Sequence, residues 1–315
     1  MTPDAPTRMD DAVRKVLAAL PEDADESVRQ RPDDPDLRTW SYLPGDRPGL
    51  CLEAADDAVA AAVHELVDLA HSEHGARLVR DAMAVERLRR LAATGKEPAG
   101  DRYWWRLVGE PGSAAAWGWR LNGHHVGVHV VVDGDRVTYS PHFVGSEPAR
   151  LPAGPGAGLR ILGPEEDLAR DLLRSLDPDQ RRRAVASDLA PADILTGMDP
   201  VADPSALPPG LGWESLDAHQ RTLFERLVDR YLARLPDAYA RACRAEAMAG
   251  PEALAFGWAG GEEVGDPHYY CVRSAAFLIE YDNTQDGANH AHSVLRHLRD
   301  DFGGDALRRH HRDHH

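Results

Sequence analysis

Cysteine is scarce in this chain, and its scarcity excludes several kinds of protein. The three cysteines, Cys51, Cys243 and Cys271, lie far apart and form no CxxC pair. A disulfide framework or a thiolate zinc knuckle needs paired or closely spaced cysteines, so we expect neither. An odd number of thiols is typical of proteins in a reducing compartment, and we therefore expect a cytoplasmic protein.

Long apolar runs and clustered positive charge are also missing. No stretch of about eighteen apolar residues occurs, so no membrane span is predicted. Residues 1–11 are polar and lack the apolar core of a secretory signal. The formal net charge is −16, and the arginines are interleaved with acidic residues. This pattern argues against nucleic acid as a partner and leaves a small-molecule substrate as the expected one.

Motifs for nucleotide binding and for nucleophilic catalysis are absent as well. The chain has neither a GxGxxG nor a phosphate-binding loop, so we expect no nucleotide cofactor. It also lacks the GxSxG elbow that carries the serine of many hydrolases. Cys271 lies inside an apolar stretch, where a buried and inert thiol is the expected state.

The chain contains enough apolar residues for a core, and these residues recur with a helical period in some segments and a period of two in others. Hydrophobic residues make up 43% of the sequence and include seven tryptophans. Apolar residues recur at helical spacing in residues 53–93, 164–195 and 215–248. Residues 102–143 and 253–282 instead alternate with a period of two, which predicts strands.

Local signals refine this pattern. Gly75 is predicted to end the first helix of the first pair, and residues 177–180 form a capping box with proline at the first helical position. Residues 198–212 are rich in proline and glycine and are expected to be loop. The segment 293–311 is expected to be helical or mixed.

The order of elements predicts an α+β fold. We expect one mostly antiparallel sheet, built from the two strand regions at about 102–143 and 253–282 and flanked by helical hairpins. Residues 1–48 are expected to be an N-terminal extension, followed by a single α+β catalytic-type domain over residues 49–311. Pairing of the two strand regions would bring together two segments that are rich in histidine.

The first of these segments covers residues 117–129. If residues 126–132 form a strand, His125, Gly127 and His129 share one face, and the intervening valines share the other. A single histidine on a strand face is commonly just solvated. Two on one face, with a glycine between them, strengthen a metal-binding interpretation, because neutral imidazole is the commonest metal ligand.

The second segment covers residues 266–292. Glu280 and Asp282 share a face at the end of an apolar strand. His290 and His292 also share a face if the chain is extended there, whereas at a helix start they would form local hydrogen bonds instead. A pair of histidines separated by one residue, together with further histidines, recurs in zinc, copper and non-haem iron sites.

Seven short segments form a pattern that extends over most of the chain. They are WGWR at 117–120, GHH at 123–125, SPHFVG at 140–145, PHYY at 267–270, EYDNTQ at 280–285, NHAHSVLR at 289–296 and DFG at 301–303. Together, from about residue 40 to 310, they resemble an uncharacterised bacterial and fungal family, domain of unknown function 3500. The chain departs from the family pattern at His129, where that pattern has asparagine.

The resemblance implies no particular activity, but it does favour certain residues. It supports His124 or His125, together with His268, His290 and His292, over His129. We therefore predict a divalent metal ion, either zinc, iron or copper, with candidate ligands His125, His268, His290 and His292. The predicted catalytic residues are His124, Glu280 and Arg296.

Two of the predicted catalytic residues, Glu280 and Arg296, have an expected task. Glu280 would be a fourth ligand or a general base, and Arg296 would pair with an anionic substrate or with Asp282. Hydrolysis of a small organic substrate is favoured because a metal-activated water needs no further cofactor. The same ligands would also serve an iron- or copper-dependent oxidoreductase, a non-catalytic metal- or ligand-binding protein, or a metal-free histidine network.

Overall fold

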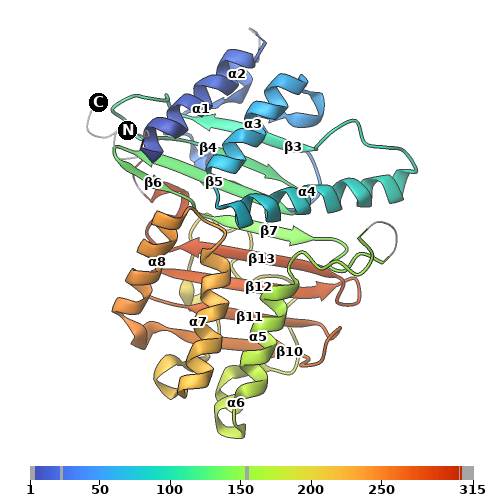
Figure 1. Ribbon diagram of the computed structural model, residues 1–315, viewed down its shortest axis with the longest axis vertical. Helices are drawn as coiled ribbons and strands as arrows, with labels where there is room; N and C mark the ends of the chain where they lie inside the picture. Colours follow the sequence, from blue (N-terminus) through green and yellow to red (C-terminus); the bar gives the residue numbers. More distant parts are fainter. Residues whose placement is uncertain (1–3, 22–23, 153–155, 305, 307–315) are drawn as a thin grey trace.

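The computed structural model describes residues 4–21, 24–152, 156–304 and 306, and it has the predicted α+β architecture. A thirteen-stranded sheet runs through the molecule, and the helices lie on one of its faces (Figure 1). None of the described helices combines the length and apolarity that a bilayer crossing requires.

The strand order is β1-β3-β4-β5-β7-β13-β12-β11-β10-β8. Three short strands lie off this path: β2 pairs with β3, β6 with β5 and β9 with β10. Pairing is antiparallel except for β1 with β3 and β8 with β10. The strands are β1 (Arg29–Gln30), β2 (Leu50–Cys51), β3 (Tyr103–Val108), β4 (Trp117–Gly123), β5 (Val126–Asp133), β6 (Arg136–Thr138), β7 (His142–Ser146), β8 (Val185–Ser187), β9 (Leu211–Gly212), β10 (Ala255–Gly260), β11 (His268–Arg273), β12 (Phe277–Gln285) and β13 (His290–His297).

The β7–β13 pair joins the two strand regions into one sheet, as the sequence predicted. Its register places Ser146 opposite Ala291 and Phe143 opposite Val294. The expectation of helical or mixed structure over residues 293–311 was wrong for residues 293–297, which belong to β13. Residues 305 and 307–311 of that segment lie outside the described residues. Every residue of β13 is buried between β7 and β12. Pairing on both sides outweighs the local helical preference of this segment.

The helices divide between the two halves of the sheet. In Figure 1, α1, α3 and α4 cover the half that contains β3, β4 and β5, and α5, α7 and α8 cover the half that contains β10 to β13. The bounds are α1 (Ala5–Ala19), α2 (Asp25–Val28), α3 (Asp57–Leu69), α4 (Glu73–Thr94), α5 (Gly163–Ser175), α6 (Pro178–Ala184), α7 (Ala218–Leu232) and α8 (Asp237–Ala249). The capping box predicted at residues 177–180 begins α6.

The two faces of the sheet are covered differently. A large apolar core fills the space between the sheet and the helices. On the opposite face, three smaller clusters form where loops, rather than helices, pack on the strands. One contains Leu37, the second Trp40, Tyr42 and Ile194, and the third Leu207. Residues before 49 take part in both layers, since Met9 of α1 belongs to the main core and Trp40 and Tyr42 belong to a cluster on the loop side.

Gly75 does not end a helix, so that prediction was wrong. The chain breaks at Ser72, whose hydroxyl accepts a hydrogen bond from the Gly75 amide at 3.0 Å and caps α4. Gly75 therefore lies in the first turn of α4. A Cβ at this position would lie 1.8 Å from the carbonyl oxygen of Arg234. Glycine is required here by the close approach of two backbones.

A buried ion pair ties α5 and α7 to the sheet. Arg234, which follows α7, and Glu165 of α5 are both fully buried, and their Nη2 and Oε1 atoms lie 3.0 Å apart. Arg234 also donates a hydrogen bond to the hydroxyl of Ser293 in β13. Arg230 contacts the same Glu165 oxygen at 3.1 Å.

We expect Glu165→Gln to lower the free energy of unfolding by about 3–5 kcal/mol, because it leaves the buried charge of Arg234 without its counter-ion. The measurement is urea denaturation followed by circular dichroism. Glu225→Gln is the matched control: it breaks a half-exposed pair with Arg244 and should cost less than about 1 kcal/mol. Similar losses in the two variants would contradict a stabilising role for the buried pair.

Candidate functional site

A tight turn places His124 and His125 at the end of the β4–β5 hairpin. Gly123 pairs with Val126, so the two histidines are the two turn residues. His125 has a φ of 67°, in the left-handed region that few residues other than glycine adopt. Its amide donates to the carbonyl of Tyr42 and its carbonyl accepts from the amide of Gly145 at 2.8 Å. These two bonds hold the turn in this conformation.

The imidazole cluster, which we define as His124, His125, His290 and Glu147, forms where three strand ends meet. Each residue offers one ligand atom, and these atoms all lie within 4.8 Å of one another. The Nε2 atoms of His125 and His290 are 2.7 Å apart. The Nε2 atom of His124 lies 3.8 Å from the Glu147 carboxylate, which is 28% exposed. The cluster is thus buried but opens to solvent at Glu147.

Glycine at position 145 makes room for the cluster. A Cβ there would lie 2.5 Å from Cδ2 of His125 and 2.9 Å from the carbonyl oxygen of Ala291. Both distances are too short for a side chain, so the His125 ring packs directly on the backbone of β7. The position of this ring therefore depends on the β7–β13 pairing.

Carboxylates orient two of the three rings. Glu86 of α4 lies 2.7 Å from Nδ1 of His124, and Asp286 lies 3.2 Å from Nδ1 of His290. Each carboxylate accepts a hydrogen bond from the N–H group at Nδ1, which leaves the lone pair on Nε2, and Nε2 points into the cluster. Metal-binding histidines are commonly held in this way by carboxylates behind them.

Burial keeps the rings of His125 and His290 neutral. It lowers the pKa of His125 well below its usual value, and the neighbouring histidines lower it further. Burial also lowers the pKa of His290. Glu86 behaves in the opposite way: although burial acts against its charge, hydrogen bonds from Arg89 and His124 lower its pKa. His125 and His290 are thus neutral nitrogen donors, and the Glu86 carboxylate behind His124 is ionised.

A second group of possible ligands, Asp193, Asp282 and His292, lies beside the imidazole cluster. Nδ1 of His292 is 2.8 Å from Asp193 and 3.6 Å from Asp282, and burial raises the pKa of Asp282 well above its usual value. The His292 ring centre is 4.7 Å from that of His290. His290 and His292 therefore share a face, as predicted for an extended chain, but fall into neighbouring groups.

Glu280 lies outside both groups. Its carboxylate is fully buried and accepts hydrogen bonds from the amides of Leu195 and Thr196, from the Thr196 hydroxyl and from the Tyr269 hydroxyl. Burial raises its pKa, and these hydrogen bonds oppose the rise. The contacts anchor the loop that carries Asp193. A role for Glu280 in turnover stays a prediction.

The structure also separates His268 and Arg296 from the imidazole cluster. His268 stacks on Trp258, with ring centres 4.7 Å apart, inside the core that the helices cover. Arg296 forms an ion pair with Asp301 rather than with Asp282. Neither residue belongs to a group of possible metal ligands among the described residues.

Sequence patterns did not identify four carboxylates that lie near the histidines, namely Glu86, Glu147, Asp193 and Asp286. Only Glu86 carried a usable signal, because a charge at the fourth position after Ala82 interrupts the buried stripe of an amphipathic helix. The other three lie outside helices, in turns, in a loop or after a strand, where no periodic pattern marks them.

His129 lies on the face predicted for it but belongs to neither group. Its Nδ1 donates to the carbonyl of Pro141 at 3.0 Å, and its ring packs against Trp40 and Phe302. Burial lowers its pKa to about 3. Burial likewise lowers the pKa of His71 and of His268 to about 4.

These neutral histidines predict a loss of stability in acid. Below about pH 6.5 the unfolded chain binds protons that the folded protein does not, so the free energy of unfolding falls as pH falls, by about 1.4 kcal/mol per pH unit for each such group. His129→Asn removes one group and keeps a donor for Pro141. Between pH 7 and pH 5, we expect this variant to lose about 2 kcal/mol less than the parent protein in urea denaturation.

Substitution of the exposed His219 by asparagine is the control and should leave the slope unchanged, since this side chain is exposed in the folded protein. If His129→Asn and the parent protein lose stability in parallel over this pH range, His129 is not a neutral buried group.

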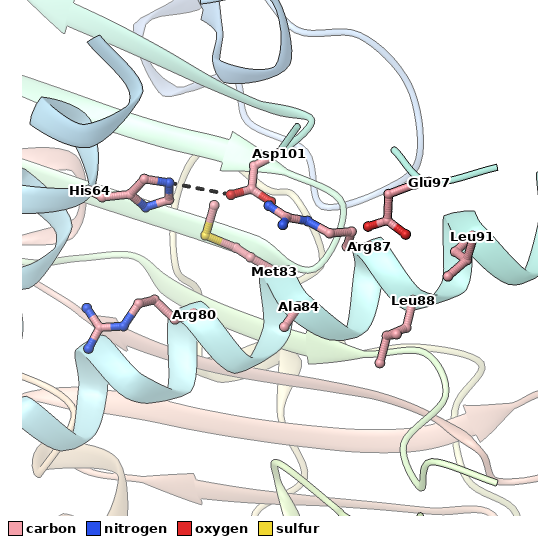
Figure 2. A pocket seen from close by; sticks show the side chains of 9 residues that line it. All are labelled: His64, Arg80, Met83, Ala84, Arg87, Leu88, Leu91, Glu97 and Asp101. Carbon is pink, nitrogen blue, oxygen red and sulfur yellow. Dashed lines mark hydrogen bonds and ion pairs between the residues drawn. The ribbon is translucent and has the colours of Figure 1, made fainter. Parts of the chain in front are cut away.

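Apart from the histidine groups, a cavity of about 480 Å³ lies along α4. Figure 2 shows its lining side chains, with Asp101 between His64 and Arg87. Asp101 pairs with Arg87 at 2.6 Å and with His64 at 3.4 Å. The residues that line this cavity include none of the site residues predicted from the sequence.

Comparison with known proteins gives a family but no activity. The sequence model of a family described as "Protein of unknown function (DUF3500)" matches residues 4–304. No curated protein and no solved structure matches the chain. The geometry of the site is therefore the basis for assigning a function to this protein.

Proposed function

The chain belongs to the DUF3500 family, and from the geometry of the imidazole cluster we propose that it is a metalloenzyme. His124, His125 and His290 would hold one divalent transition-metal ion, with Glu147 beside it. The reaction would be hydrolysis of a small organic substrate. The observation that carries this proposal is the convergence of three imidazoles, two of them oriented by carboxylates at Nδ1.

The donor set fits such an ion after a small adjustment. Two nitrogens bound to one tetrahedral zinc ion lie about 3.3 Å apart, given zinc–nitrogen bonds of about 2.0 Å. The Nε2 atoms of His125 and His290 are 2.7 Å apart, a hydrogen-bond distance at which one neutral ring donates to the other. Binding would replace this hydrogen bond and separate the two nitrogens by about half an ångström.

In the proposed reaction, the ion would supply Lewis acidity and lower the pKa of a bound water. Glu147 would accept the proton of the attacking water, because its carboxylate lies beside His124 and reaches solvent. Glu86 and Asp286 would keep the rings of His124 and His290 in place. Imidazole and carboxylate donors also suit iron and copper, so the identity of the metal would distinguish hydrolysis from oxidation.

The first test is metal content. Four histidines near the end of the sequence lie outside the described residues and could bind metal on their own, so they are replaced by alanine in every sample: His310, His311, His314 and His315. Untagged protein is supplied in turn with zinc, iron(II) and copper(II), dialysed, and analysed by mass spectrometry. We expect about one equivalent of one metal per chain, as for a mononuclear site.

In the same assay, His290→Ala should lose the metal, while circular dichroism shows an intact fold. A ligand in a preformed site contributes little to core packing. His292→Ala should keep most of the metal, since its Nδ1 contacts Asp193 in the neighbouring group, and His219→Ala should keep all of it. Full metal content in His290→Ala, or no binding of any of the three metals by the parent protein, would contradict the proposal.

The second test addresses the base. Turnover by the metal-loaded protein is screened on chromogenic nitrophenyl esters and phosphates. With a substrate found in this screen, Glu147→Gln should lower the rate on the order of 10²-fold, the usual contribution of a positioned base, and retain the metal. Glu280→Gln is the comparison: from its contacts it should reduce stability more than rate. The opposite ranking of the two variants would assign the base to Glu280.

A further inference from the structure

A second cavity, of about 420 Å³, lies over β3 and β4 on the face of the sheet that the loops cover. We call it the arginine pocket and define it by the lining residues Trp40, Trp104, Arg106, Arg120 and Asn122. It does not include any residue of the imidazole cluster.

Three arginines line this pocket, and two of them face each other. The third, Arg47, lies over the Trp104 ring and donates a hydrogen bond to the carbonyl of Gly45. Arg106 of β3 and Arg120 of β4 are directly opposite in the strand register, and Trp104 is opposite Asn122 in the same way. Like charges at opposite positions repel each other, so this pairing costs stability unless something compensates it. Arg120 is buried, with only 7% of its surface exposed.

Neither of the two facing arginines has an acidic partner. In the part of the chain that the structure describes, no carboxylate oxygen lies within 4.0 Å of either guanidinium. Arg120 donates to the carbonyls of Leu37 and Thr39. Nε of Arg106 is buried without a hydrogen-bond partner. Burying charge without a counter-ion is costly, and the natural remedy is an anion from solution.

The electrostatics of the two arginines agree with this geometry. Burial and the charge of Arg106 together lower the pKa of Arg120 to about 10, and the charges of Asp34 and Asp36 oppose this shift. Burial also lowers the pKa of Arg106. Both guanidinium groups still carry their charge at neutral pH, so two positive charges share a partly desolvated space.

The carboxylates of Asp34, Asp36 and Asp46 also line the pocket. Those of Asp34 and Asp36 raise the pKa values of Arg106 and Arg120 from a distance, but neither comes within 4.0 Å of the two guanidiniums. Asp34 accepts a hydrogen bond from the amide of Asp36 at 2.9 Å, and Asp46 pairs with Arg102 at 2.5 Å. The cavity in Figure 2 is different, because its Arg87 is already neutralised by Asp101. Unpaired arginines thus distinguish the arginine pocket from the cavity on α4.

We propose that the arginine pocket binds a small organic carboxylate with a planar apolar body. The two guanidiniums match the two oxygens of a carboxylate, which they can bind through parallel hydrogen bonds. Trp40 and Trp104 provide flat apolar surface for the body of the ligand, and the Trp40 indole N–H has no acceptor among the described residues. The volume lies in the usual range for organic ligands, about 300–1,000 Å³, and is larger than an inorganic ion needs.

The test is isothermal titration calorimetry on the full chain in EDTA, so that its outcome is independent of any metal. The probes are benzoate, its neutral analogue benzamide, acetate and inorganic phosphate, all at one ionic strength. Benzoate should bind at least about tenfold more tightly than benzamide, which lacks the charge, and more tightly than acetate, which lacks the ring. Equal binding of benzoate and benzamide, tighter binding of phosphate than of benzoate, or no binding of benzoate would overturn the proposal.

Two matched variants locate the site. Arg106→Gln, at a half-buried position, should weaken benzoate binding by about ten- to a hundredfold, the usual effect of losing a hydrogen bond to a charged group. Arg182→Gln removes an exposed arginine whose carboxylate partner, Asp179, does not line the pocket. It should change the affinity less than about threefold, because solvent screens its charge. Equal losses in the two variants would show a non-specific charge effect and reject the pocket.

Discussion

The pairing of β7 with β13 is the constraint on which the candidate site depends. This antiparallel ladder joins two half-sheets, each covered by its own helices, and its register places His292 opposite Gly145. The same register brings the start of β13 next to the hairpin turn that carries His125. Two segments 165 residues apart in sequence thereby place their imidazole nitrogens 2.7 Å from each other. A shift of one residue in this ladder would turn the histidines to the other face.

The surroundings of the imidazole cluster make its burial tolerable. Desolvation keeps His125 and His290 neutral, and carboxylates on α4 and after β12 satisfy the Nδ1 atoms of His124 and His290. The left-handed backbone of His125 is held by hydrogen bonds on both sides. Strained backbone and desolvated polar groups persist only where the surrounding structure enforces them, and such places are often functional.

The loop-covered face of the sheet carries the arginine pocket and the second group of possible metal ligands. Helices cover the other face with an extended apolar core. On the loop side, the segment around Trp40 and Tyr42 covers both the arginine pocket and the Asp193 contact with His292. Loops often position binding residues over a rigid scaffold. The arginine pocket and the contact between Asp193 and His292 therefore lie on the loop side, whereas the imidazole cluster lies at strand ends and also contacts Glu86 of α4.

Local patterns in the sequence were sufficient for several features. Period-two alternation predicted the strands and the face of His129, and the spacing of His290 and His292 predicted a shared face, because strand geometry follows from the residues themselves. Tertiary contacts decided the rest. Gly75 serves a close approach to Arg234, β13 is a strand because it pairs on both sides, and Glu147 and Asp286 meet the histidines from turns without a periodic signal. Contacts between distant segments are set by the packing of the whole chain, and no local pattern encodes them.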